Sequence, residues 1–237
     1  MTDDEIRTEA IEFAKRNKMR IARELTDPGK FHSEEQPISV FMAGSPGAGK
    51  TEFSKSLIGI IEETRHCNVV RIDTDEIRTQ LPGYIGGNAY LFQGAASLIV
   101  EKVHDLVLKQ GQTFILDGTF AKYEKAVQNI ERSLNVGRRA FIFYLYQKPE
   151  IAWKFTEARE ATEGRNIPKA AFIGQFIGAR EVAERIRNQF GEEVVLFLVK
   201  KNFEKNTVDE VVKIDQGKRF DDYLDGHYTK DELEKLL

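Results

Sequence analysis

Short runs made up mainly of apolar residues alternate along the chain with longer stretches in which apolar residues recur at helical spacing. Each run is short enough to be a strand buried on both faces of a sheet. These runs are ISVFMA (38–43), VVRI (69–72), TFIL (113–116), RAFIFYLY (139–146) and VVLFLV (194–199). The stretches between them, such as 91–109, place apolar side chains on one helix face. The pattern predicts an α/β fold with a mainly parallel sheet of about five strands and helices on both faces.

Amphipathic helical patterns also occur at the two ends of the chain. Residues 3–25 predict one or two helices, and 26–37, with two prolines and a glycine, predict a connector. Thr229 stands three positions before Glu232, a capping-box spacing that predicts a short last helix. We therefore expect a helical extension and connector at 1–37, a central domain at 38–202, and a helical extension at 203–237 that packs on the domain.

Composition excludes several classes of protein. With 41% hydrophobic residues, the 237-residue chain can bury a full core, and its formal net charge of −3 gives no sign of a nucleic-acid partner. The single cysteine, Cys67, cannot form an internal disulfide. The acidic N-terminus is unlike a signal peptide, and no apolar stretch is long enough for a membrane span. We expect a soluble cytoplasmic protein that binds no membrane.

The first apolar run leads into GSPGAGKT (44–51), which fits the pattern G-x-x-x-x-G-K-[ST] at every fixed position. It lies between a predicted strand and a predicted helix, which favours a phosphate-binding loop over an ordinary glycine-rich turn. Lys50 would contact the β- and γ-phosphates of ATP, and the Thr51 hydroxyl would ligate Mg²⁺. The candidate nucleotide-binding residues are Gly44, Ser45, Pro46, Gly47, Ala48, Gly49, Lys50, Thr51 and Glu52.

Elements of two other nucleotide-binding classes are missing from the sequence. No Asn-Lys-x-Asp run that would read guanine follows a later strand. The third apolar run ends in FILDGT, with Gly118 at the position where an ATP-driven motor carries a water-activating Glu. These two observations favour transfer of a phosphoryl group to an acceptor other than water.

An acceptor hydroxyl needs a carboxylate near its proton, and VVRIDTDEIR offers Asp73 and Asp75 at the end of the second run. Ligands of open α/β sheets bind beyond the carboxyl ends of the strands, where both residues would lie. Alternation along an extended chain would point them to the same side. We expect Asp75 to be the base, whereas Asp73 either contacts the substrate or caps the next helix.

The segment FTEAREATEGRNIPKAAF (155–172) places Arg159 and Arg165 around a break in a helical pattern. Arginines on a mobile lid can stabilise the charge on a transferring phosphoryl group. A solvated, charged helix end is the alternative explanation of the same residues.

Together, these motifs resemble the zeta-toxin family of P-loop kinases, over about residues 39–172. The phosphate loop of the family is similar to FMAGSPGAGKT, its Asp-x-Asp element to IDTD, and its acidic-Gly-Thr element to LDGT. The resemblance implies that Asp75 is the general base and that Asp117 and Thr119 contact the substrate or Mg²⁺. By spacing, a family carboxylate near the sugar pocket falls on Glu101.

The resemblance also implies that Arg159 and Arg165 are the two lid arginines, and that the acceptor is a sugar nucleotide, UDP-N-acetylglucosamine. The N-terminal helices, residues 3–25, either only pack over the sheet or, like a separate antitoxin protein, cover the nucleotide site and restrain activity. The chain departs from the family at Asp117, where Glu is more common, and at Phe120 and Ala121, where a basic residue commonly follows Gly-Thr. Two alternatives stay open: a kinase for another small hydroxyl compound, such as an antibiotic, nucleoside or cofactor, and a nucleotide-binding regulatory protein with little catalysis.

Overall fold

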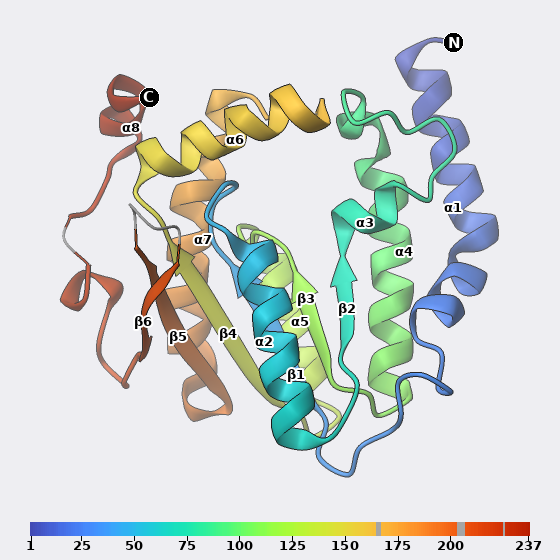
Figure 1. The fold of residues 1–237 in the computed structure, drawn as a ribbon, viewed down its shortest axis with the longest axis horizontal. Coiled ribbons are helices and arrows are strands. Elements are labelled where there is room, and N and C mark those ends of the chain that lie inside the picture. The colour runs from blue at the N-terminus through green and yellow to red at the C-terminus, as the bar shows by residue number, and fades with distance from the viewer. Residues whose placement is uncertain (165–166, 203–206, 225) are drawn as a thin grey trace.

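A computed structural model describes residues 1–164, 167–202, 207–224 and 226–237 (Figure 1). Helices and strands alternate through most of the chain. In chain order they are α1 (Asp3–Leu25), β1 (Ile38–Ala43), α2 (Lys50–Arg65), β2 (Val70–Asp73), α3 (Thr74–Arg78), α4 (Ala89–Lys109), β3 (Phe114–Asp117), α5 (Tyr123–Leu134), β4 (Arg139–Tyr146), α6 (Pro149–Glu163), α7 (Lys169–Phe190), η1 (Gly191–Glu193), β5 (Val194–Lys201), β6 (Val208–Lys213), η2 (Phe220–Asp222) and α8 (Lys230–Leu236).

The strands form one sheet in the order β2-β3-β1-β4-β5-β6, in which the first five are parallel. All five predicted runs become strands, which confirms the α/β fold with a mainly parallel sheet. The sheet of the described residues has one strand beyond the five runs, because β6 pairs antiparallel with β5. This strand lies within the segment predicted to be a helical extension. It is a largely exposed edge strand with no continuous apolar run, and its sequence, VDEVVK, therefore gave no strong signal. The division into domains stays a prediction.

Helices cover both faces of the sheet (Figure 1). On one face, α2 packs on residues of β1, β3 and β5, including Val40, Ile115 and Val199. On the other, α4, α5 and α7 form the larger core around Phe41, Phe114 and other buried side chains. Burial on both faces explains why the strands are continuous apolar runs. Helix α1 packs on the outer side of α4 and not on the sheet itself.

The parallel strands bring their carboxyl ends to one edge of the sheet, where ligands of open α/β sheets bind. The segment 44–49 follows β1 at this edge, and Asp73 and Asp117 end β2 and β3 in paired register. Helix α6 runs across the same edge (Figure 1). None of the described helices combines the length and apolar character needed to cross a membrane.

Candidate functional site

The segment between β1 and α2 has the backbone shape of a phosphate cradle. Gly49 is the N-cap of α2 and has a left-handed φ of 82°, and no side chain of the described part of the chain caps this helix by a hydrogen bond. The first N–H groups of α2 can therefore bind an anion. The Nζ of Lys50 donates to the carbonyl oxygens of Gly44 (3.0 Å) and Ser45 (2.6 Å), so its charge lies along the loop. These features fit the phosphates of ATP.

Helix α6 rests directly on this loop. A Cβ added at Gly47 would lie 2.0 Å from the carbonyl oxygen of Ala152 and 2.9 Å from Oγ1 of Thr156. This contact fixes the helix that carries the predicted lid residue Arg159, whose side chain is half-buried. The other predicted lid residue, Arg165, lies outside the described residues. The break predicted in the helical pattern is present, because α6 ends at Glu163 and α7 begins at Lys169.

At the ends of β2 and β3, two aspartates share a network with Arg71. The Arg71 guanidinium donates to Asp73, to Glu76 and to Oδ2 of Asp117 (2.8 Å). Oδ2 of Asp117 also accepts from the Ser54 hydroxyl at 2.9 Å. Burial and the charge of Asp117 raise the pKa of Asp73, although Arg71 opposes them. Burial alone would lower the pKa of Arg71, but the neighbouring carboxylates raise it above its usual value.

Asp75 is in a helix and not in an extended segment, so the alternation of side chains along a strand does not apply to Asp73 and Asp75. Helix α3 begins at Thr74, and Oδ1 of Asp73 accepts from the Asp75 backbone N–H at 2.7 Å. The capping role considered for Asp73 is therefore confirmed. The Asp75 carboxylate pairs with Arg78 at 2.6 Å. Its side chain is 35% exposed, against 10% for Asp73 and 5% for Asp117, so Asp75 is the most accessible of the three.

The residues proposed for Mg²⁺ lie on neighbouring elements. Thr51 is in the first turn of α2. The hydroxyl of Ser54, one turn later, lies 3.0 Å from the carbonyl oxygen of Thr51 and also contacts Oδ2 of Asp117. The described ranges contain no group of three or more His, Cys, Asp or Glu that could hold a metal by itself. A Mg²⁺ ion commonly binds one or two protein oxygens together with substrate phosphates, and Thr51 with Asp117 fits that mode. The carbonyl oxygen of Thr119 accepts from the Gly44 N–H at 3.2 Å, which ties the LDGT segment to the loop.

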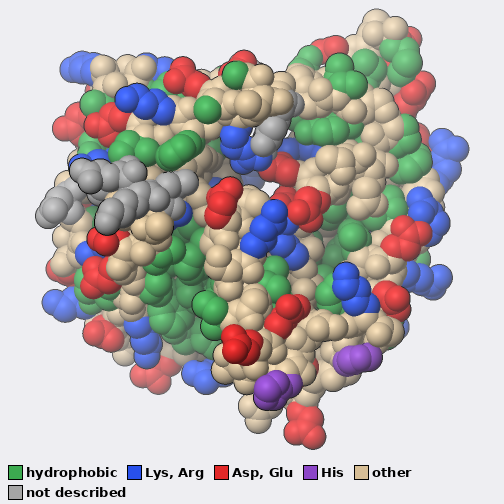
Figure 2. Space-filling view, in the orientation of Figure 1, with side chains coloured by type: hydrophobic (Ala, Val, Ile, Leu, Met, Phe, Trp, Pro, Cys, Tyr) green, Lys and Arg blue, Asp and Glu red, His purple; other side chains and the backbone are tan. Residues whose placement is uncertain are grey.

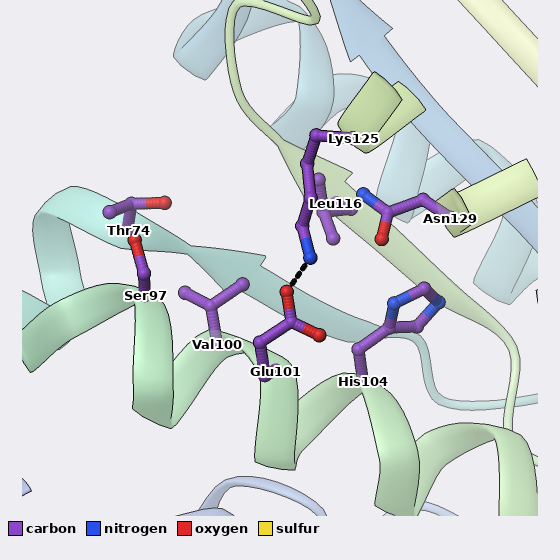
Figure 3. Close-up of a pocket in the computed structure, with 8 residues that line it drawn as sticks. All are labelled: Thr74, Ser97, Val100, Glu101, His104, Leu116, Lys125 and Asn129. Atoms are coloured by element: carbon purple, nitrogen blue, oxygen red, sulfur yellow. Dashed lines mark ion pairs between the residues drawn. The ribbon is translucent and has the colours of Figure 1, made fainter. Parts of the chain in front are cut away.

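A cavity of about 150 Å³ opens beside the carboxylates, between α4 and α5 (Figure 3). Glu101 points into it and forms an ion pair with Lys125 of α5, and its other oxygen pairs with Arg132 at 3.1 Å. Thr74, between Asp73 and Asp75, lines the same cavity, so Glu101 and the start of α3 border one space. The deeper wall is formed by His104, which is buried. Burial and the charge of Arg132 lower the pKa of His104 to about 3, so it is neutral.

Sequence reasoning missed three cations at this edge: Arg71, Lys125 and Lys201. Lys201 is buried at the end of β5, and its Nζ would lie 3.0 Å from a Cβ added at Gly49. Burial lowers the pKa of Lys201 below its usual value, and the charge of Glu52 only partly opposes this. Arg71 could have been noticed because it interrupts the apolar run VVRI, and a charge in a buried strand needs a partner.

Figure 2 shows acidic and basic side chains side by side around a hollow beneath α6.

The parallel sheet and the phosphate loop between β1 and α2 give the chain a P-loop NTPase/kinase fold. A model of the family described as zeta toxin matches residues 21–213, and the chain belongs to this family. A comparison with curated proteins found no match.

Solved structures share the fold at low sequence identity. A structure of the PezAT chromosomal toxin-antitoxin system of Streptococcus pneumoniae is 20% identical, with a TM-score of 0.65 over 94% of this chain and 90% of that chain. A structure of AvrRxo1-ORF1:-ORF2 with ATP is 13% identical, with a TM-score of 0.58 over 89% of this chain and 65% of that one. A structure of the Pnkp1/Rnl/Hen1 RNA repair complex is 18% identical, with a TM-score of 0.51 over 65% of this chain and 47% of that chain.

Proposed function

We propose that this protein is an ATP-dependent phosphotransferase that moves the γ-phosphoryl group of ATP to a hydroxyl of a small molecule. One observation carries the proposal. The phosphate cradle at Gly44–Thr51 and the accessible carboxylate of Asp75 follow β1 and β2 at the same edge of the sheet, and Thr74, next to Asp75, lines a cavity. Membership of the zeta toxin family is consistent with this reading.

Each part of the site has a task in this reaction. The loop and Lys50 hold the phosphates. Asp75 accepts the proton of the acceptor hydroxyl while the oxygen of that hydroxyl bonds to the γ-phosphorus. The bond between that phosphorus and the β–γ bridging oxygen breaks, and ADP leaves. Mg²⁺, held by Thr51 and Asp117, would neutralise phosphate charge. Arg159 and Arg165 would stabilise the charge of the transferring group.

The acceptor we propose is a sugar nucleotide, with UDP-N-acetylglucosamine as the first candidate, bound near Asp73, Glu101 and Thr119. One observation favours another small hydroxyl compound. Glu101, the carboxylate proposed to contact the sugar, is already paired with Lys125 and Arg132 in the cavity. A panel experiment separates the two. ADP release from ATP is measured with UDP-N-acetylglucosamine, other sugar nucleotides, nucleosides and aminoglycosides. Stimulation by UDP-N-acetylglucosamine supports the first acceptor, and stimulation only by another compound rejects it.

Replacing the proposed base tests whether the protein is an enzyme or a nucleotide-binding regulator. We expect Asp75→Asn to bind ATP like the wild type but to transfer the phosphoryl group about 10²- to 10⁴-fold more slowly, because proton transfer is lost. Binding is measured by calorimetry and transfer by coupled ADP detection. Asp209→Asn on the exposed strand β6 is the matched control and should keep full activity. Full transfer by Asp75→Asn would remove Asp75 as the base, and a wild type without acceptor-dependent ADP release would favour a regulator.

We also propose an antitoxin protein as a partner of this chain, since it belongs to the zeta toxin family. Growth of cells that express the wild type, compared with cells that express Asp75→Asn, tests toxicity. Co-expression with genes that neighbour its own would identify the antitoxin. Equal growth of both strains would argue against a toxic activity and so against the need for an antitoxin.

A further inference from the structure

Arg71 binds several side chains at the ligand-binding edge of the sheet. It comes from the middle of β2, and its side chain is only 10% exposed. Its guanidinium contacts Asp73, Glu76 and Asp117, and its Nε lies 3.3 Å from the Ser54 hydroxyl. One arginine therefore joins α2, β2, the start of α3 and the end of β3.

The two buried carboxylates that Arg71 joins would repel each other without it. Asp73 and Asp117 are register partners on adjacent parallel strands, and both are at most 10% exposed on their side chains. Removing a carboxylate from water is costly unless a cation or several hydrogen bonds compensate it. Proteins meet this need at paired acids either with a bound divalent cation or with a fixed basic side chain.

We propose that Arg71 is a positioning residue that serves as the built-in counter-cation of Asp73 and Asp117, in the place where these two carboxylates would otherwise bind a divalent cation. The inference deepens the proposed function, since it rests on the role proposed there for Asp117. It has one consequence for the site: the carboxylates are held in place before any nucleotide arrives. Arg71 and Ser54 both bind Oδ2 of Asp117, so Asp117 offers its Oδ1 to the divalent cation that enters with ATP.

The planar guanidinium suits this role better than an ammonium group would. Arg71 uses Nη1 toward Glu76, Nη2 toward Asp73 and Asp117, and Nε toward Ser54, so a single side chain serves four oxygen-bearing groups. Lysine supplies one compact charge and cannot reproduce this fork. Arg71→Lys should therefore preserve part of the charge compensation and lose the arrangement.

Direct binding of Mn²⁺ to the nucleotide-free protein tests the proposal without any assay of activity. Free Mn²⁺ is counted by electron paramagnetic resonance during titration of the wild type, Arg71→Met and the matched control Arg65→Met. Arg65 is on α2 and pairs with Glu34, away from the cluster. We expect Arg71→Met to bind one Mn²⁺ at least about 10-fold more tightly than the wild type, because the freed carboxylates become ligands. Arg65→Met should match the wild type, and adding Asp117→Asn to Arg71→Met should remove the gain.

Arg71→Met could fold poorly because it leaves two buried acids without a cation, and two further measurements cover that outcome. In thermal unfolding, Mn²⁺ should raise the melting temperature of Arg71→Met and leave that of the wild type nearly unchanged, because a ligand stabilises the state it binds. Arg71→Lys should bind Mn²⁺ with intermediate affinity. The proposal is overturned if neither variant binds Mn²⁺ more tightly, or is stabilised more by it, than the wild type. A wild type that lacks phosphoryl transfer would reject the proposed function and leave these results unaffected.

Discussion

Three aspartates at one sheet edge have different surroundings, and these suit them to different tasks. Asp73 is buried and its pKa is raised by that burial and by Asp117, and it caps α3 through its own side chain. Asp117 is held by Ser54 and Arg71. Asp75 pairs with Arg78 and keeps the most exposed carboxylate. The sequence could indicate Asp75 from the IDTD motif alone. It could not indicate the partner of Asp117, because Arg71 is 46 positions away along the chain.

The neutral state of His104 makes stability depend on pH. Burial, with the charge of Arg132, lowers its folded pKa to about 3, while the unfolded chain has a His pKa near 6.5. As the pH falls below about 6.5 toward the folded pKa, only the unfolded chain takes up a proton at this residue, so the folded state loses stability. We expect this group to cost about 2 kcal/mol between pH 7 and pH 5. Urea unfolding at both pH values measures it.

The matched variants for this prediction are His104→Gln and His32→Gln. His104→Gln should not show the loss of about 2 kcal/mol in unfolding free energy between pH 7 and pH 5 that the His104 pKa difference causes. His32 is exposed on the connector before β1, and its variant should keep the full pH dependence. If His104→Gln and the wild type lose equal stability between pH 7 and pH 5, the imidazole is not held neutral in the folded protein.

Among the elements, the strands buried on both faces were the easiest to predict. The bounds of β1 and β4 match the apolar runs, because a strand covered by helices on both sides must be apolar throughout. The contact between α6 and the phosphate loop was not predictable. It depends on the approach of Gly47 to Ala152, and the glycine in the motif indicates a turn without indicating which helix lies against it. The edge strand β6 was missed because it needs no apolar face.

Two glycine substitutions should have opposite effects on stability, because α6 packs on Gly47 whereas Gly59 is in an open position of α2. Gly47→Ala places a Cβ 2.0 Å from the carbonyl oxygen of Ala152 at a φ of 70°, so we expect a loss of about 2–4 kcal/mol and weaker ATP binding. Gly59→Ala, in the exposed interior of α2, meets nothing within 4 Å and should add about 0.5–1 kcal/mol. Chemical denaturation measures both. A Gly47→Ala variant as stable as Gly59→Ala would show that α6 does not rest on the loop.

The whole molecule combines a predictable sheet with an arrangement of outer helices that the sequence left open. Alternating apolar runs and helical patterns were sufficient for the α/β class and for the edge that carries the site. The amphipathic pattern of residues 3–25 showed that this segment buries one face, and the sheet was the expected partner of that face. In the structure that face packs on α4, with Ala10, Ala14, Ile21 and Ala22 buried. The Tyr90 hydroxyl donates to Asp3 and ties the start of α1 to the start of α4.

This position of α1 predicts that the helix stabilises the domain and does not restrain the nucleotide site in cis. Ile21→Ala removes a side chain that is 1% exposed, so we expect a loss of about 2–5 kcal/mol in unfolding free energy. Met19→Ala, at a side chain that is 39% exposed on the same helix, should change stability by no more than about 0.5 kcal/mol. ADP release per folded molecule, measured below the melting temperature of both variants, should equal that of the wild type. A clear rise in ADP release for Ile21→Ala, absent in Met19→Ala, would instead mean that loosening α1 exposes the phosphate cradle, and that the helix acts as an internal restraint.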